Sequence, residues 1–196
     1  MISSLPSELV RAVRLTVWFA VVTGLLYSLA ITGVAQAVFP SQANGSVVTK
    51  NGQIVGSQLI GQDFRSDRYF HGRASATATP YAADNSAGSN LGPNNKALVD
   101  RVASSARTVR HENGLGPNDQ VPVDLVTADF SGFDPDITEA SALLQAPRVA
   151  KARGLDEARV RALVERYVHG RILWIFGEPY INVLELNMAL DAGEAA

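Results

Sequence analysis

A serine, a histidine and an aspartate near a glycine-rich stretch could form a hydrolytic triad. Ser86 or Ser89 would be the nucleophile, with His71 as general base and Asp84 to orient the imidazole, because a hydroxyl needs an adjacent base to become nucleophilic. The G-x-S-x-G turn that presents such a serine is missing from the chain. Residues of these three types also meet easily by chance in a polar loop, so we expect no catalytic residue.

A group of carboxylates around Gly132 could instead bind a cation. Its members are Asp129, Asp134, Asp136 and Glu139. Their spacing does not match a calcium loop, and an aspartate before Pro135 is also a good helix cap. The three histidines, at positions 71, 111 and 169, lack a metal-ligand spacing such as H-x3-H. We therefore expect no metal site, and we expect the aspartate before Pro135 to cap a helix.

Composition excludes several further classes of function. The formal net charge is −2 and there is no long basic run, so nucleic acid is not an expected partner. Cysteine is absent, which removes disulfides, thiolate zinc sites and cysteine nucleophiles. The phosphate-loop pattern is also absent, and the stretch from Gly88 to Gly92 lacks its lysine. No directly bound cofactor is expected.

The strongest feature of the chain is an uncharged run from Leu15 to Val38. It exceeds the roughly 20 residues that a helix needs to cross a bilayer of about 30 Å. A cleaved signal peptide is the alternative, since Ala35-Gln36-Ala37 has the small-x-small form of a cleavage site. The apolar region of a signal peptide has only about 7–15 residues, however. The length therefore favours a retained transmembrane helix.

The basic residues around this run predict its orientation. Arg11 and Arg14 precede it, whereas only Lys50 lies in the stretch that follows, and Lys and Arg stay on the cytoplasmic side. We expect a single-pass protein of the inner (plasma) membrane. Residues 1–14 would be a short cytoplasmic N-terminus, residues 15–38 the transmembrane helix and residues 39–196 one extracytoplasmic domain.

Small and polar residues recur at every fourth position of the helix. They are Ala20, Gly24, Ser28, Thr32 and Gln36. Helices associate in lipid through close backbone approach and interhelical hydrogen bonds. We therefore interpret the first four, called the helix row here, as a surface that packs against another helix. The alternative is that glycine and serine are simply common in membrane helices.

The first half of the outer domain combines a hairpin with a long polar loop. Asn51-Gly52 lies between two β-branched runs and predicts a tight hairpin, and Tyr69-Phe70 is a candidate short strand. Residues 74–95, called the polar loop here, show no helical or strand period, and such long loops are usually functional or disordered. Its stretch 84–93 could bind an anion or a partner's backbone, or could simply be solvated.

The second half predicts three helices and a strand. We expect a helix over Lys96–Asn113, a strand over Val121–Ala128 and a short helix from Pro147 that ends before Gly154. Asp156 is the expected N-cap of the next helix, with Leu155 and Val160 as its hydrophobic staple. That helix has an apolar face, formed by Val160, Leu163, Val164, Tyr167 and Val168.

Two apolar runs near the C-terminus, Ile172–Phe176 and Ile181–Leu190, could be buried strands or short helices. Strands mixed with helices predict an α+β fold, with α/β as the alternative.

Eight short motifs, taken in order, resemble one known family. The first are Phe39-Pro-Ser-Gln-Ala-Asn-Gly-Ser46, Gly56-Ser-Gln-Leu-Ile-Gly-Gln62, Tyr69-Phe-His-Gly-Arg73 and Gly88-Ser-Asn-Leu-Gly-Pro93. The others are Val121-Pro-Val-Asp-Leu-Val-Thr127, Asp134-Pro-Asp-Ile137, Pro147-Arg-Val-Ala-Lys-Ala-Arg-Gly154 and Gly177-Glu-Pro-Tyr-Ile-Asn-Val-Leu-Glu-Leu-Asn187. Together they resemble the C subunit of the Kdp potassium-transporting ATPase, over almost the whole chain.

This resemblance implies a function and a set of partners. The partners would be a potassium-channel-like subunit, a P-type ATPase subunit and a very small hydrophobic subunit. The family is assigned to assembly and stability of that complex, and is described as a catalytic chaperone that raises the pump's affinity for ATP. An outer hydrolase or binding module that is anchored in the membrane and acts alone is the alternative.

The resemblance also points to one loop as a contact or nucleotide site. Its residues would be Ser86, Gly88, Ser89, Asn90 and Gly92, within a stretch that is Ser-Gly-Gly-Ser in the family and has Ala87 at the second position here. ATP is cytoplasmic, whereas the arginine bias puts this loop outside. We therefore expect any effect on ATP affinity to pass through the membrane helices as a coupling between distant sites.

Overall fold

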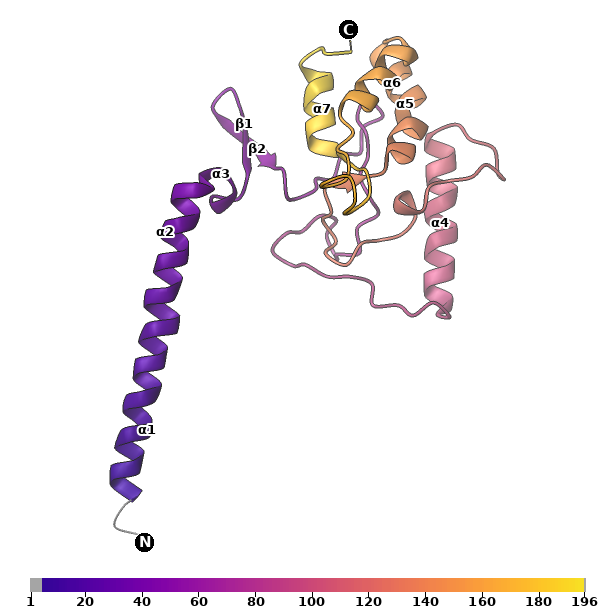
Figure 1. The fold of residues 1–196 in the computed structure, drawn as a ribbon. Coiled ribbons are helices and arrows are strands. Elements are labelled where there is room, and N and C mark those ends of the chain that lie inside the picture. The colour runs from indigo at the N-terminus through magenta and orange to yellow at the C-terminus, as the bar shows by residue number, and fades with distance from the viewer. Residues whose placement is uncertain (1–4, 196) are drawn as a thin grey trace. The chain divides into compact units, whose positions relative to one another are not determined.

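The computed structural model describes residues 5–195, which form two units. The first unit ends at Val47 and the second begins at Val48. Figure 1 labels the elements of both units.

The first unit is one long helix followed by a short one. Its segments are α1 (Leu5–Phe19), the π-helix η2 (Ala20–Tyr27), α2 (Ser28–Val38) and α3 (Pro40–Ala43). The stretch Pro6–Val38 is long and apolar enough to cross a membrane, and its 33 residues extend about 50 Å. Phe39 leaves the helical region with φ −132° before Pro40 starts the next turn, because a residue that precedes proline disfavours the helix.

The second unit mixes helices with two small strand pairs. Its elements are β1 (Val47–Lys50), β2 (Gln53–Ser57), α4 (Lys96–Glu112), η3 (Val123–Leu125), β3 (Asp136–Ile137), α5 (Glu139–Arg153), α6 (Glu157–Arg166), β4 (Ile181–Asn182) and α7 (Val183–Asp191). β1 pairs with β2, and β3 pairs antiparallel with β4 in the register Ile137↔Ile181. The predicted mixed fold is confirmed in its α+β form.

The core of the second unit lies between α5, α6 and α7. Phe70, Val149, Leu163 and Leu186 are fully buried in it. Because α5 and α6 are joined by a tight turn at Gly154, they pack side by side as a helical hairpin (Figure 1). This cluster is the scaffold that holds the loops described below.

Several local predictions are confirmed. The hairpin turn has φ of 54° at Asn51 and 79° at Gly52, as the Asn-Gly pair requires. The Asp156 side chain caps α6 by accepting a hydrogen bond from the Ala158 N–H at 2.7 Å. Gly154 ends α5 in the left-handed region with φ 69°. The residues of the predicted α6 face are buried or pack on the core: Val160, Leu163, Val164, Tyr167 and Val168. Leu155 of the predicted staple packs there too.

Two predictions about element boundaries are wrong. The stretch Val121–Ala128 is not a strand; it forms the short turn η3, in which Asp124 is buried and bonds to the start of α5. Pro147 does not begin a helix, because α5 starts at Glu139 and contains the proline. Thr138 is the N-cap, and its hydroxyl accepts a hydrogen bond from the Ser141 N–H.

The two C-terminal apolar runs differ from each other. Ile181–Asn182 is a buried strand that leads into α7, whose N-cap is Asn182. The run Ile172–Phe176, called the apolar tip here, is neither a strand nor a helix and is exposed on a tight turn. Tyr69-Phe70 is not in a strand either, although its backbone is held by side-chain amides.

Candidate functional site

Two side-chain amides hold the extended segment around Phe70 against the core. Asn187 on α7 accepts from the Phe70 N–H at 2.8 Å and donates to the Phe70 carbonyl at 2.9 Å. Gln145 on α5 does the same for His71, at 2.8 and 3.1 Å. Each amide thereby supplies the donor and acceptor that a neighbouring strand would supply. The segment is fixed without a sheet.

A buried arginine extends this network. The side chain of Arg148 is 6% exposed, and its Nη2 donates to the Gln145 side chain at 2.8 Å. Its Nη1 donates to the carbonyls of Asp67 and Tyr69, and its Nε to Asn113 at the end of α4. Burial lowers the pKa of Arg148. These bonds stabilise the buried guanidinium, since a buried charge must be hydrogen-bonded.

A cavity of about 450 Å³, lined by both polar and apolar residues, opens beside this network. His71, Arg73, Tyr81 and Glu112 line it, and the Tyr81 hydroxyl donates to the Arg73 carbonyl at 2.6 Å. A Cβ at Gly72 would collide with that hydroxyl, so the His-Gly-Arg triplet needs its glycine.

The hydrolytic triad is not assembled. The ring nitrogens of His71 face the Ser66 carbonyl at 3.1 Å and the Glu112 carboxylate at 3.5 Å. Burial and the nearby Arg148 lower the pKa of His71, which favours the neutral imidazole. Of the two candidate serines, Ser86 donates its hydroxyl hydrogen to the Ser131 carbonyl.

Two of the carboxylates near Gly132 bind backbone groups. Asp129 accepts from the N–H groups of Gly132 and Asp134 at 3.0 and 3.1 Å. Asp134 accepts from the Asp136 N–H and from the Arg73 guanidinium, each at 3.0 Å. Asp134 does not cap a helix, however; it caps the turn that leads to β3. The described residues contain no cluster of three such ligands that could hold a metal ion.

The polar loop is ordered by contacts with residues 129–134. The Ala87 N–H and the Ser86 hydroxyl both donate to the Ser131 carbonyl at 3.1 Å. A Cβ at Gly88 would lie 3.2 Å from the Phe130 backbone, so a larger residue there would separate the two segments. Ser89 is half-buried, whereas Asn90 and Gly92 are exposed. The outer part of this loop is thus available to a partner.

The helix row is exposed along its length. Ala20, Gly24, Ser28 and Thr32 carry no buried side chain, and a Cβ at Gly24 would meet nothing within 4 Å. The row crosses the π-helix η2. A row of every fourth residue drifts by about 40° per step on a straight α-helix, and a π-turn rotates less per residue and so reduces this drift.

Sequence reasoning missed the amide clamps and the exposure of the apolar tip. Asn187 and Phe70 are 117 residues apart, and no local pattern announces such a bond. The tip has the composition of a buried run. The residues before it, His169-Gly170-Arg171, contain neither asparagine nor proline, which would have indicated an exposed turn. Its two consecutive positive φ values, at Leu173 and Trp174, occur in residue types that rarely adopt them.

Comparison with known proteins places this geometry in context. The family model described as "KdpC: K+-transporting ATPase, c chain" matches residues 9–192. The potassium-transporting ATPase KdpC subunit of Rhodopseudomonas palustris (strain BisB18) is 50% identical, covering 95% of this chain and 98% of that protein. The KdpC subunit of Bradyrhizobium diazoefficiens is 49% identical over 96% and 98% of the two chains. That of Methylobacterium nodulans is 51% identical over 97% and 98%.

Proposed function

The chain belongs to the KdpC family of K+-transporting ATPase c chains, and we propose that it is an accessory, non-catalytic subunit of an ATP-driven potassium uptake complex. It assembles or stabilises a channel-like subunit, a P-type ATPase subunit and a small hydrophobic subunit. The observation that carries the proposal is similarity over nearly the full length of relatives named KdpC subunits.

The proposed topology is a single membrane crossing with the N-terminus in the cytoplasm. Helix Pro6–Val38 is long enough to cross the bilayer, and the family match begins at residue 9. The apolar helix therefore belongs to the part shared with the family, as expected of a retained anchor. Arg11 and Arg14 near its start favour a cytoplasmic N-terminus.

The described residues support a role in assembly better than a role in chemistry. His71 faces the Ser66 carbonyl and not the candidate serines, and the carboxylates of Asp129 and Asp134 bind backbone groups. By contrast, the helix row and the outer part of the polar loop are exposed. Two separate surfaces are thus available, one in the membrane and one outside it.

An effect on the pump's ATP affinity would be indirect in this topology. Nucleotide binds on the cytoplasmic side and the second unit lies outside, so the coupling must pass through packed membrane helices. We propose the helix row as the element that transmits it. Such coupling is typically 1–3 kcal/mol, or roughly 5–150-fold in affinity.

The decisive experiment is affinity purification of the tagged full chain from membranes in mild detergent. We expect the channel-like, P-type and small hydrophobic subunits to co-purify. Recovery of the chain alone, with an intact helix, would contradict the proposal. Steady-state ATPase kinetics of the complex, measured with and without this chain, then test the indirect effect. We expect a higher KM for ATP when the chain is absent.

A further inference from the structure

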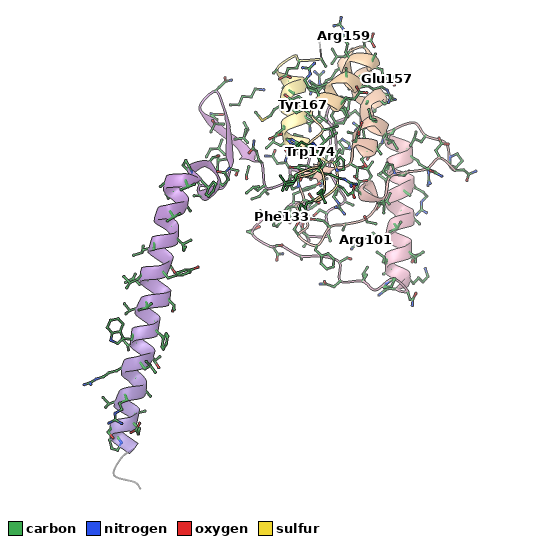
Figure 2. The ribbon with its side chains drawn as sticks, viewed as in Figure 1. Arg101, Phe133, Glu157, Arg159, Tyr167 and Trp174 are labelled. Carbon is green, nitrogen blue, oxygen red and sulfur yellow. The ribbon has the colours of Figure 1, made fainter. Side chains whose placement is uncertain are left out.

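The apolar tip is the largest continuous group of exposed apolar side chains in the second unit. The exposed fractions are 71% for Ile172, 68% for Leu173, 90% for Trp174, 73% for Ile175 and 62% for Phe176. Figure 2 labels Trp174, on the segment between α6 and α7. Other exposed apolar residues there, such as Val123 and Phe130, stand singly in the sequence. Contiguous exposure of this kind marks an interaction site.

The tip is held outward by ordered backbone. Ile172 and Phe176 exchange two backbone hydrogen bonds, of 2.9 and 3.0 Å, across the turn. His169 and Tyr180 exchange two more, of 2.8 and 3.1 Å, at its base, and their rings stack with centroids 5.0 Å apart. The side chains are therefore exposed on a closed, paired loop.

The backbone of the tip is also strained. Leu173 and Trp174 have φ of 53° and 61°, in the left-handed region that bulky residues avoid. Strain of this kind persists where the surroundings determine the conformation, and it concentrates at functional sites. Here it projects a tryptophan that is 90% exposed.

We propose that the apolar tip inserts into the membrane in which the chain is anchored, at the headgroup region of the extracytoplasmic leaflet. All five side chains of the tip are apolar and more than 60% exposed, which suits a fluid lipid phase. Tryptophan favours the headgroup level, where its ring is in an apolar medium and its N–H in a polar one. The Arg171–Glu178 ion pair, at 2.6 Å, lies at the base of the tip and stays in water.

The anchor keeps the tip close to lipid, and this step rests on the proposed function. Residues 39–47 alone join the apolar helix to the second unit. At no more than about 3.6 Å per residue they reach about 30 Å, and the short helix α3 shortens that reach. The second unit therefore samples a small volume at the bilayer surface, which raises the effective concentration of tip and lipid.

Site-directed spin labelling of the full chain tests this proposal. The chain contains no cysteine, so a nitroxide can be attached at Ile175→Cys, with Trp174 kept. Val123→Cys is the matched control, since Val123 is 69% exposed and belongs to η3, not to the tip. Leu25→Cys reports the membrane helix. Each variant is reconstituted into phosphatidylethanolamine–phosphatidylglycerol vesicles, and its collisions with oxygen and with a water-soluble nickel chelate are measured.

We expect the oxygen-to-nickel collision ratio to be several-fold higher at position 175 than at 123, and highest at 25. A lipid-like ratio at 25 with a water-like ratio at 175 would overturn the insertion and leave the anchored subunit intact. A water-like ratio at 25 would overturn both. If the label at position 175 is shielded from the nickel chelate only after the transporter subunits are added, the tip binds a protein partner and not lipid.

Tryptophan fluorescence is a second test, which remains valid if the cysteine at position 175 disturbs the turn. In Trp18→Phe, Trp174 is the only remaining tryptophan, and its emission should shift to shorter wavelength and be quenched by brominated lipid in vesicles. Unchanged, water-like emission of the folded chain would contradict insertion.

Discussion

Asn187 and Phe70 form a closed pair in which one side-chain amide satisfies both backbone groups of a buried residue. The two hydrogen bonds are 2.8 and 2.9 Å long, and both residues are about fully buried. The bonds tie α7 to the extended segment that leads into the cavity wall. Together with Gln145 and His71, they give the second unit its main long-range polar connection.

Replacing Asn187 with leucine should destabilise the second unit by about 2–4 kcal/mol. The buried N–H and carbonyl of Phe70 would lose their partners, and each unsatisfied group costs about 1–3 kcal/mol. Thermal unfolding of the full chain in detergent should show a clear drop in Tm. Asn85→Leu is the control, because Asn85 is exposed and surface changes usually stay within about 0.5 kcal/mol. Equal Tm values for the two variants would rule out the clamp as a stabilising feature.

Asp136 should make the stability of the second unit depend on pH. Burial, and next the nearby Asp134, raise its pKa from 3.8 to about 6. The folded chain therefore holds this proton more tightly than the unfolded chain, and stability falls as pH rises from about 4 to 6. Asp136→Asn keeps an acceptor for Asn182 and removes the charge. We expect it to raise the free energy of unfolding by about 1 kcal/mol at pH 8.

This gain should shrink to nothing near pH 4, where the native carboxyl is protonated too. Unfolding of both proteins is measured at several pH values, with Asp84→Asn as the exposed control. A constant difference between Asp136→Asn and the native chain at every pH would assign the effect to packing instead of titration.

Features that depend on residues close together in the sequence could be predicted. The Asn51-Gly52 turn, the Asp156 cap and the Gly154 stop each depend on residues that lie next to one another, and all three are confirmed. The Val160 to Val164 face follows the helical period, so its burial was predictable as well.

Contacts between residues far apart in the sequence explain several of the elements that could not be predicted. The alternation around Asp124 resembles a strand, but its carboxylate turns inward to bond the Thr138 N–H and the Ser141 hydroxyl. Pro147 resembles a helix start, but α5 already begins after the Thr138 cap and contains the proline in its interior, where proline is normally unfavourable. The apolar tip has the composition of a buried run, and composition does not say what covers it.

Replacing Gly24 with leucine should weaken assembly of the complex on the order of tenfold, or about 1.4 kcal/mol. A bulky residue in the helix row holds the partner helix away from the backbone. It meets open space within the chain itself, so the fold is undisturbed. Gly33→Leu is the matched control, since Gly33 also faces open space but lies outside the row. Co-purified partner subunits are quantified for both, and equal recovery would exclude the row as the contact surface.

The polar loop should contribute to subunit contact and not bind ATP. It lacks the lysine of a phosphate cradle, and its Ser86 hydroxyl is bonded to the Ser131 carbonyl. Gly92→Trp should reduce complex assembly or potassium-stimulated ATPase activity several-fold, because Gly92 is exposed and faces open space. Gly92→Ala adds only a methyl group, which meets nothing within 4 Å, and should leave both unchanged.

Calorimetry of the full chain in detergent separates subunit contact from nucleotide binding. We expect no saturable heat of ATP binding, with or without Ser89→Ala. A saturable site that disappears in Ser89→Ala would instead mean direct contact between this loop and nucleotide, and would require the second unit to face the cytoplasm. Normal assembly and activity of Gly92→Trp, with no ATP heat, would leave the loop as a solvated surface. The two measurements thus assign the loop to one of three roles, because each role changes a different observable.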